Sequence, residues 1–219
     1  MTPWLAFAQG TFEPHENLLV IDFFLGALVS FFIGSLPFGY WAGLVNRIDI
    51  RTEGSGNIGT TNVFRVLGKK WGTIVFVADV LKGFIPVFLA AHWVIGPFSD
   101  LFQVFCGMCA ILGHNYTPFL RFKGGKGIAT SAGVLLGIMP LTLACALSSW
   151  IIILALFRYV SVASICAALI LPVATWFFYR DHAWLLGAAV VMCILAIVRH
   201  RANIVRLYHG TELKMGQQR

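Results

Sequence analysis

Two apolar runs, LTLACALSSWIIILALF at residues 141–157 and VSVASICAALILPVATWFFY at residues 160–179, decide the fold class of this chain. Neither run contains a charged side chain, and only Arg158 and Tyr159 separate them. A helix that crosses the roughly 30 Å hydrocarbon core of a bilayer needs about 20 predominantly apolar residues. The sequence therefore predicts two consecutive membrane-spanning helices here.

Five more apolar runs lie near residues 18–45, 72–95, 100–113, 126–139 and 183–198. We predict an all-α, polytopic membrane protein with about seven transmembrane helices. The runs at 100–113 and 126–139 are short, because a helix of about 14 residues covers only roughly 21 Å. If these two form a re-entrant pair the count falls to five. Either count is odd and places the two ends of the chain on opposite sides of the membrane.

The composition agrees with a membrane protein that has no separate soluble domain. Hydrophobic residues make up 58% of the 219 residues, charged residues make up 11%, and the mean hydropathy is +0.82. We therefore expect residues 1–219 to form a single integral-membrane domain. The net charge of +7 fits membrane orientation and anionic ligands better than nucleic acid, which is not an expected partner. All five cysteines lie in apolar runs, so no disulfide framework is expected.

The Lys and Arg residues predict the orientation of the chain. Under the seven-helix count, 14 of the 16 fall on one side of the membrane, and Arg180 is the only one on the other side. The positive-inside rule then places the N-terminus outside and the C-terminus in the cytoplasm. Residues 1–17 would be a short extracytoplasmic lead-in and residues 199–219 a cytoplasmic tail.

Two glycine-rich polar loops, Gly54–Asn62 and Lys123–Gly127, lie between the apolar runs on this cytoplasmic side. Irregular backbone beside a bilayer persists where it lines a cavity or a watery site. The second loop leads directly into the run at 126–139, so its amides and Lys126 would attract phosphate at a helix start. A plain cytoplasmic turn explains the same residues, and the spacing does not match a Walker A loop.

Other polar groups are expected on the same side. The first loop adds Ser55, Asn57, Thr60, Thr61 and Asn62, followed by a short segment with Arg65. If the last helix continues beyond the membrane, Arg199, Asn203 and Arg206 share one face with His200 beside them, although a basic collar at the membrane surface would look the same. Ser161 lies at a similar level.

Asp79 and Lys82 form an intramembrane pair on one helix face. Such a pair indicates either function or a neutralising structural role. The groups together favour an anion with more than one phosphate-like group, and no acidic cluster indicates a metal.

Six stretches of the sequence carry a specific resemblance. They are GSLPFGY (34–40), DIRTEGSGNIGTTNVFRVLGKKWG (49–72), DVLKGFIP (79–86), GHNYTPFLRFKGGKGIAT (113–130), RYVSVASI (158–165) and RHRANIVRL (199–207). Together they resemble the acyl-phosphate-dependent glycerol-3-phosphate acyltransferases of bacteria, the PlsY family. The resemblance covers residues 33–214.

The resemblance implies an inner-membrane enzyme with its active site facing the cytoplasm. It would transfer a fatty acyl group from acyl phosphate to the sn-1 hydroxyl of glycerol 3-phosphate, with lysophosphatidate and phosphate as products. No cofactor and no metal are implied; the bilayer and the soluble enzyme that makes acyl phosphate would be its partners. The residues implied as catalytic are Ser55, Arg65, Lys126, Ser161, His200 and Asn203. Those expected to bind substrate are Gly54, Gly56, Asn57, Thr61, Asn62, Asp79, Lys82, Gly124, Gly125, Gly127 and Arg206.

The hydroxyl would attack the acyl carbon directly, because acyl phosphate already carries a good leaving group. Either His200 or an oxygen of a substrate phosphate would take the proton, and the sequence leaves both routes open. A transporter or flippase of a small organophosphate or lysolipid is the alternative function. Asp79, Lys82 and the two short runs are the features that favour it, whereas the gathering of polar groups on one face favours an enzyme.

Overall fold

The computed structural model describes residues 16–94 and 96–217, and within them every regular element is helical. The elements are α2 (Glu16–Ser35), α3 (Phe38–Val45), α4 (Thr60–Trp93), α5 (Ser99–Asn115), the 3-10 turn η1 (Pro118–Leu120), α6 (Ile128–Ile138), α7 (Pro140–Phe157), α8 (Val160–Tyr179), α9 (Ala183–Arg199) and α10 (Arg201–Tyr208). The predicted all-α class is confirmed. Most of the predicted lead-in, residues 1–17, lies outside the described residues.

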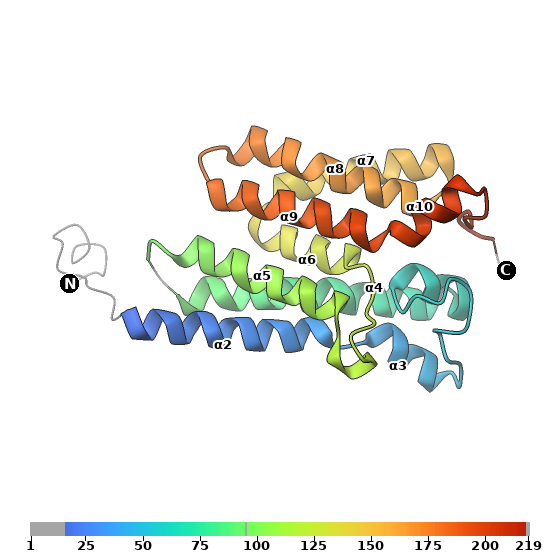
Figure 1. Ribbon diagram of the computed structural model, residues 1–219, viewed down its shortest axis with the longest axis horizontal. Helices are drawn as coiled ribbons and strands as arrows, with labels where there is room; N and C mark the ends of the chain where they lie inside the picture. The colour runs from blue at the N-terminus through green and yellow to red at the C-terminus, as the bar shows by residue number, and fades with distance from the viewer. Residues whose placement is uncertain (1–15, 95, 218–219) are drawn as a thin grey trace.

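The long helices lie side by side along the long axis of the molecule (Figure 1). Helix α5 packs on α2 and α4, α6 packs on α4, and α8 lies between α7 and α9. The loop before α4 and helix α10 lie at the right-hand end of Figure 1 and the loop before α6 lies in its right-hand half, whereas α2 begins at the left-hand end. The connectors that were predicted to share one face of the membrane therefore gather at one end of the bundle.

Four described helical segments are long and apolar enough to cross a membrane: Leu19–Val45, Thr60–Trp93, Pro140–Phe157 and Val160–Tyr179. A fifth follows if α9 and α10, which meet at an angle of 52°, count as one broken span. Helix α6 is apolar but only 11 residues long. The total of seven crossings and the orientation of the two ends remain predictions.

Apolar side chains cover the outside of the bundle. Leu156 is 69% exposed and Phe177 is 74% exposed, while Asp79 and Lys82 are buried inside. Water would disfavour this distribution, but a bilayer solvates the apolar side chains and leaves the charged pair to be satisfied within the protein. The exposed surface therefore fits an integral membrane protein.

Helices α4 and α6 approach closely because glycine lies at their contact. A Cβ atom on Gly83 of α4 would collide with the carbonyl oxygen of Thr130 in α6. A Cβ atom on Gly133 of α6 would likewise collide with the carbonyl oxygen of Val80. Small residues at helix contacts allow backbones to pack this closely in a membrane, and here they fix α6 against α4 just beyond the second glycine loop.

Two helices differ from the predicted runs. The run at 18–45 is interrupted at Leu36 and Pro37, since proline has no N–H for the helix. Helix α4 begins at Thr60, twelve residues before the predicted run at 72–95, and so contains Arg65. Its helical geometry breaks at Gly68, where φ is 80°. The predicted short segment with Arg65 is therefore the first part of a longer, kinked helix.

Candidate active site

The first glycine loop is organised by the amides of its own asparagines. Asn62 is buried, its Oδ1 accepts from the amide of Ser55 at 2.8 Å, and its Nδ2 donates to the carbonyls of Ile50 and Glu53. Asn57 Oδ1 accepts from the amide of Gly59 at 2.9 Å. Both side chains thus close turns within the loop. This geometry gives them a supporting role beside the substrate-binding role expected from the sequence.

The loop needs glycine at two of its positions. Gly54 and Gly56 have φ of 59° and 70°, in the left-handed region where a side chain is disfavoured. A Cβ atom on Gly54 would also collide with Oδ1 of Asn62. These two glycines shape the loop, and Ser55 lies between them, half-buried. Thr61 is exposed in the first turn of α4.

The second glycine loop is held from both sides. The amide of Gly124 donates to the carbonyl of Asn115 at 3.2 Å, and that of Gly125 donates to the carbonyl of His114 at 3.1 Å. Arg199 at the end of α9 donates to the carbonyls of Gly124 and Gly125 at 2.9 and 2.7 Å. The expectation that the amides of this loop attract phosphate is therefore wrong for Gly124 and Gly125, because both amides already donate to main-chain carbonyls.

The amides that are still available to an anion lie at the start of α6, directly after this loop. Gly127 caps α6 with φ of 82°. The first amides of a helix have no partner inside it, and here the amides of Ile128 and Ala129 hold those positions. Lys126 precedes them directly, so an ammonium group and the start of a helix meet at one point.

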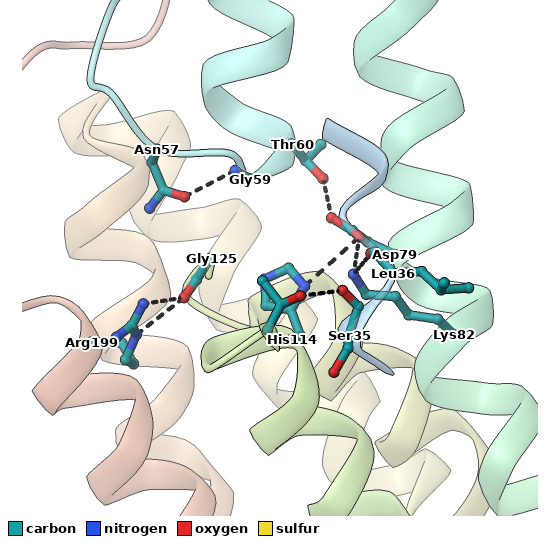
Figure 2. A network of polar contacts seen from close by, with 11 residues as sticks. Ser35, Leu36, Asn57, Gly59, Thr60, Asp79, Lys82, His114, Gly125 and Arg199 are labelled. Carbon is teal, nitrogen blue, oxygen red and sulfur yellow. Dashed lines mark hydrogen bonds and ion pairs between the residues drawn. The ribbon is translucent and has the colours of Figure 1, made fainter. Parts of the chain in front are cut away.

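A buried polar chain connects the two loops (Figure 2). Asp79 Oδ1 lies 2.7 Å from Lys82 Nζ and 3.8 Å from His114 Nδ1. Thr60 Oγ1, at the start of α4, donates to Asp79 Oδ2 at 3.5 Å. Lys82 Nζ also donates at 2.8 Å to the carbonyl of Leu36, which the break before Pro37 leaves without a helical partner. The chain thus runs from the first loop through Asp79 to His114.

His114 then connects this chain to the second loop. Its carbonyl accepts from the amide of Gly125, and a Cβ atom on Gly125 would collide with its ring. The side chains of Asp79 and Lys82 are each only 3% exposed. Both were expected to bind substrate, but this geometry fits support of the loops better than contact with a ligand.

Helix α9 ends at Arg199 with His200 as its C-cap, and α10 continues from there at a different angle. The helix was expected to continue straight, with Arg199, Asn203 and Arg206 on one face, but it bends by 52° at this point. His200 Nδ1 lies 2.8 Å from the carbonyl of Ala196. A carbonyl can only accept, so Nδ1 carries the proton and Nε2 of the neutral ring is left as an acceptor. The bend therefore places the imidazole beside α10 with a defined tautomer.

The tail after α10 folds back onto the site. Glu212 Oε1 accepts from Ser161 Oγ at 2.8 Å and from Asn203 Nδ2 at 2.6 Å, and its Oε2 accepts from Arg206 Nε at 2.7 Å. Burial alone would raise the pKa of Glu212, but these hydrogen bonds hold the pKa below its ordinary value. Glu212 is not among the site residues predicted from the sequence. It is the only acid after Asp181, and that isolation within a basic tail was the available signal.

Two further contacts fasten the tail. The amide of Met215 donates to the carbonyl of Arg158 at 2.7 Å, and Arg65 Nε donates to the carbonyl of Gln217 at 3.2 Å. The tail thus bridges α4, the start of α8 and α10. Asn203 Oδ1 is buried and has no hydrogen-bond partner among the described residues. A buried acceptor of this kind needs a donor, which a bound hydroxyl group would supply.

Lys126 lies near the other cations that were predicted for the site. It is half-buried and makes no salt bridge or hydrogen bond with another described residue. Burial lowers its pKa from 10.5 to about 8; the charge of Glu212 opposes this shift, and the charges of Arg206, Arg65 and Arg199 add to it. Three arginines from separate elements thus act on Lys126, with one acid among them, so the site has an excess of positive charge.

The comparisons with known proteins agree on one family. The sequence profile described as glycerol-3-phosphate acyltransferase matches residues 24–210. The chain is 43% identical over 193 residues to a glycerol-3-phosphate acyltransferase of Fusobacterium nucleatum. This alignment covers 88% of this chain and 97% of the relative. It is 45% identical over 194 residues to that of Staphylococcus haemolyticus, covering 86% and 95%.

Two solved structures are also similar to this chain. Both are crystal structures of PlsY (YgiH), an integral membrane glycerol 3-phosphate acyltransferase, and both are 38% identical in sequence and cover 89% of this chain. The glycerol 3-phosphate form superposes with a TM-score of 0.80 over 96% of its chain. The lysophosphatidic acid form gives 0.78 over 95%. The matched profile and these identities show that the chain belongs to the glycerol-3-phosphate acyltransferase family.

Proposed function

We propose that this protein transfers a fatty acyl group from acyl phosphate to the sn-1 hydroxyl of glycerol 3-phosphate. The products are lysophosphatidate and inorganic phosphate. The half-buried Lys126 ammonium lies among three arginines and makes no salt bridge with a residue that the structure describes, and this observation carries the proposal. Membership of the family and the similarity to PlsY structures in glycerol 3-phosphate and lysophosphatidic acid forms support it.

The excess of positive charge has a direct use in this reaction. Both substrates carry a phosphate group, and their mutual repulsion opposes the approach of the hydroxyl to the acyl carbon. Lys126 and Arg65 would offset this repulsion, and preorganised charges of this kind also stabilise the charge that develops on the acyl oxygen. Amides at the start of α6 would add donors for one phosphate.

The remaining site residues would orient glycerol 3-phosphate. Asn203 Oδ1 lacks a donor and fits a substrate hydroxyl. Ser161 and Arg206 are held beside it by Glu212, and Ser55 on the first loop is a further polar contact. In the reaction the hydroxyl oxygen bonds to the acyl carbon, the bond from that carbon to the phosphate oxygen breaks, and phosphate leaves. The hydroxyl proton passes to His200 Nε2 or to a substrate phosphate oxygen.

The whole chain would act as one membrane domain in the bacterial inner membrane, with this site facing the cytoplasm. The concentration of Lys and Arg at that end supports the orientation. The soluble enzyme that makes acyl phosphate would then supply the donor from the same side. The transporter alternative has no support from the family match, and Asp79 and Lys82, which had favoured it, serve as a buried support for the loops.

A direct assay tests the proposal. Purified protein in detergent is mixed with synthetic acyl phosphate and glycerol 3-phosphate, and phosphate release and lysophosphatidate are measured together. Lys126→Ala should lower kcat/KM by about 10²- to 10³-fold, the size expected for loss of one preorganised charge. Lys70→Ala, an exposed lysine of α4, is the matched control and should leave the rate unchanged. No product from the intact protein would contradict the proposal.

A further inference from the structure

A positively charged hollow lies beside the second glycine loop. It has a volume of about 400 Å³ and is lined by Tyr40, Arg51, Phe119, Leu120, Arg121 and Lys123. The first two come from α3 and the loop after it, and the other four from the turn around η1. None of the six is among the residues assigned to acyl transfer.

The base of the hollow is fixed by the core of the protein. Leu120 is buried and packs in one apolar cluster with Ile50 and Ala42, and Tyr40 packs against that cluster. The turn is also fastened to α2, because Thr117 Oγ1 donates to the carbonyl of Ser35 at 2.7 Å. The two sides of the hollow are therefore held apart at a set distance before any ligand arrives.

The backbone at the rim adopts a conformation that needs such support. Arg121 and Phe122 are consecutive residues with φ of 53° and 61°, in the left-handed region that residues with a Cβ atom rarely adopt. Hydrogen bonds from the amide of Phe122 to the carbonyl of Thr117 and from that of Lys123 to the carbonyl of Leu120 hold the turn. Strain of this kind gathers at sites of ligand contact.

The charges at the hollow favour an anion. Arg51 is half-exposed, stacks on the ring of Tyr40 at 4.7 Å and pairs with Asp49 through Nε and one terminal nitrogen. A guanidinium group has five N–H donors, so others remain for a ligand. Arg121 and Lys123 form no salt bridge with any residue that the structure describes. Three cations thus face the hollow, with one acid beside them.

Exposed aromatic side chains place the hollow at the surface of the bilayer. Phe119 is 54% exposed, Phe122 is 62% exposed and Trp41 of α3 is 42% exposed. Aromatic side chains that alternate with basic ones are typical of the level of the lipid headgroups. At that level the phosphate groups of lipids are the most abundant anions, and basic pockets on the cytoplasmic side bind them.

We propose that this hollow binds the phosphate group of an anionic phospholipid, whose acyl chains stay in the bilayer. Arg121, Lys123 and the unused donors of Arg51 would contact the phosphate oxygens, and Tyr40 and Phe119 would pack on the glycerol end of the headgroup. A purely topological role for these cations would require neither a preformed hollow nor a left-handed turn. The lipid site uses none of the side chains assigned to acyl transfer, and lipid binding there does not depend on that activity.

Native mass spectrometry of the full chain in detergent tests this proposal without a turnover assay. The protein is titrated with phosphatidylglycerol, with phosphatidylcholine and with inorganic phosphate. We expect one phosphatidylglycerol to bind with clear preference over phosphatidylcholine. Arg121→Gln with Lys123→Gln should weaken this binding about 30-fold, since each cation near the membrane surface contributes roughly a factor of five.

Two control variants separate a site from general attraction. Lys69→Gln with Lys70→Gln removes the same charge from exposed positions on α4 and should leave the affinity unchanged. Arg121→Lys with Lys123→Arg keeps the charge and should retain most of the binding, and a thermal unfolding curve of each variant checks that it folds. If the Lys69 and Lys70 variant lost as much phosphatidylglycerol binding as the Arg121 and Lys123 variant, the proposal would be overturned. Binding of inorganic phosphate as tight as that of phosphatidylglycerol would also overturn it.

Discussion

At the scale of single residues, Lys126 and His200 differ in how their surroundings prepare them for the reaction. Burial, and to a smaller extent the neighbouring arginines, lowers the pKa of Lys126, so its proton is held less firmly than that of an ordinary lysine. His200 donates from Nδ1 to the carbonyl of Ala196, which directs its acceptor nitrogen away from the helix. One residue therefore supplies charge, and the other is a candidate for proton transfer.

Activity should fall as the pH rises through the pKa of Lys126. Because that pKa is lowered to about 8, the ammonium is fully charged well below pH 8 and is lost above it. Lys126→Arg keeps a charge at every pH in this range, so the alkaline decrease in its activity should move to higher pH. Its rate at neutral pH should nevertheless drop, because the two side chains differ in shape. The measurement is kcat/KM from pH 6 to about 10. An unmoved alkaline limb in the arginine variant would assign the titration to another group.

His200→Gln tests which acceptor takes the proton. If Nε2 of His200 is the base, kcat should fall by about 10²-fold or more, the usual contribution of a positioned general base. Burial lowers the pKa of His200 to about 4, so a profile extended to acid pH should show a limb near pH 4 that disappears in this variant, since glutamine does not titrate. Turnover that persists with the same pH profile would instead assign the proton to a substrate phosphate oxygen.

At the scale of elements, the two glycine loops are connected through a buried charge pair, Asp79 and Lys82. Asp79 holds the start of α4 through Thr60 and lies beside His114, whose carbonyl holds the second loop. Lys82 neutralises Asp79 and also donates a hydrogen bond to the carbonyl of Leu36, where the α2–α3 segment is interrupted. The pair thus connects the start of α4 with the α2–α3 segment and lies beside α5.

Lys82→Met and the double variant Asp79→Asn with Lys82→Met should separate stability from positioning. The single variant leaves a buried carboxylate unpaired, which costs about 3–5 kcal/mol. The double variant removes both charges and should recover most of the thermal stability measured in detergent. Its kcat should still be about tenfold low, because the loops lose their common anchor and misplaced groups lose rate. A double variant with full kcat would show that the pair serves stability alone.

At the scale of the whole molecule, the site is completed by segments from distant parts of the chain. The tail carries Glu212 back to Ser161 at the start of α8, 51 residues earlier. It also reaches Arg65 in α4, since Gln217 accepts from that side chain 152 residues away in sequence. The tail is therefore a structural part of the site, beyond the cytoplasmic extension expected from the sequence.

Deletion of residues 211–219 should remove activity but keep the membrane fold. The tail lies at one end of the bundle, so the helix content by circular dichroism should stay close to that of the full chain. Turnover should fall by about 10²-fold, as expected when Ser161, Asn203 and Arg206 lose the carboxylate that holds them. Glu212→Gln keeps the tail and the shape of the side chain and should show a smaller loss in the same assay. A deleted chain with normal turnover would contradict this role for the tail.

The sequence alone determined the all-helical membrane class, the family and the gathering of the basic connectors at one end. Apolar length, charge segregation and glycine motifs are local properties, so the order of residues is sufficient to predict them. Only the tertiary structure decided which polar groups are available to a ligand. In the folded chain the amides of Gly124 and Gly125 donate to main-chain carbonyls, and Asp79 and Lys82 form a buried pair. The last helix bends at His200, and the tail brings Glu212 to the site. These outcomes depend on hydrogen-bond partners far apart in the chain, which no local pattern of residues specifies.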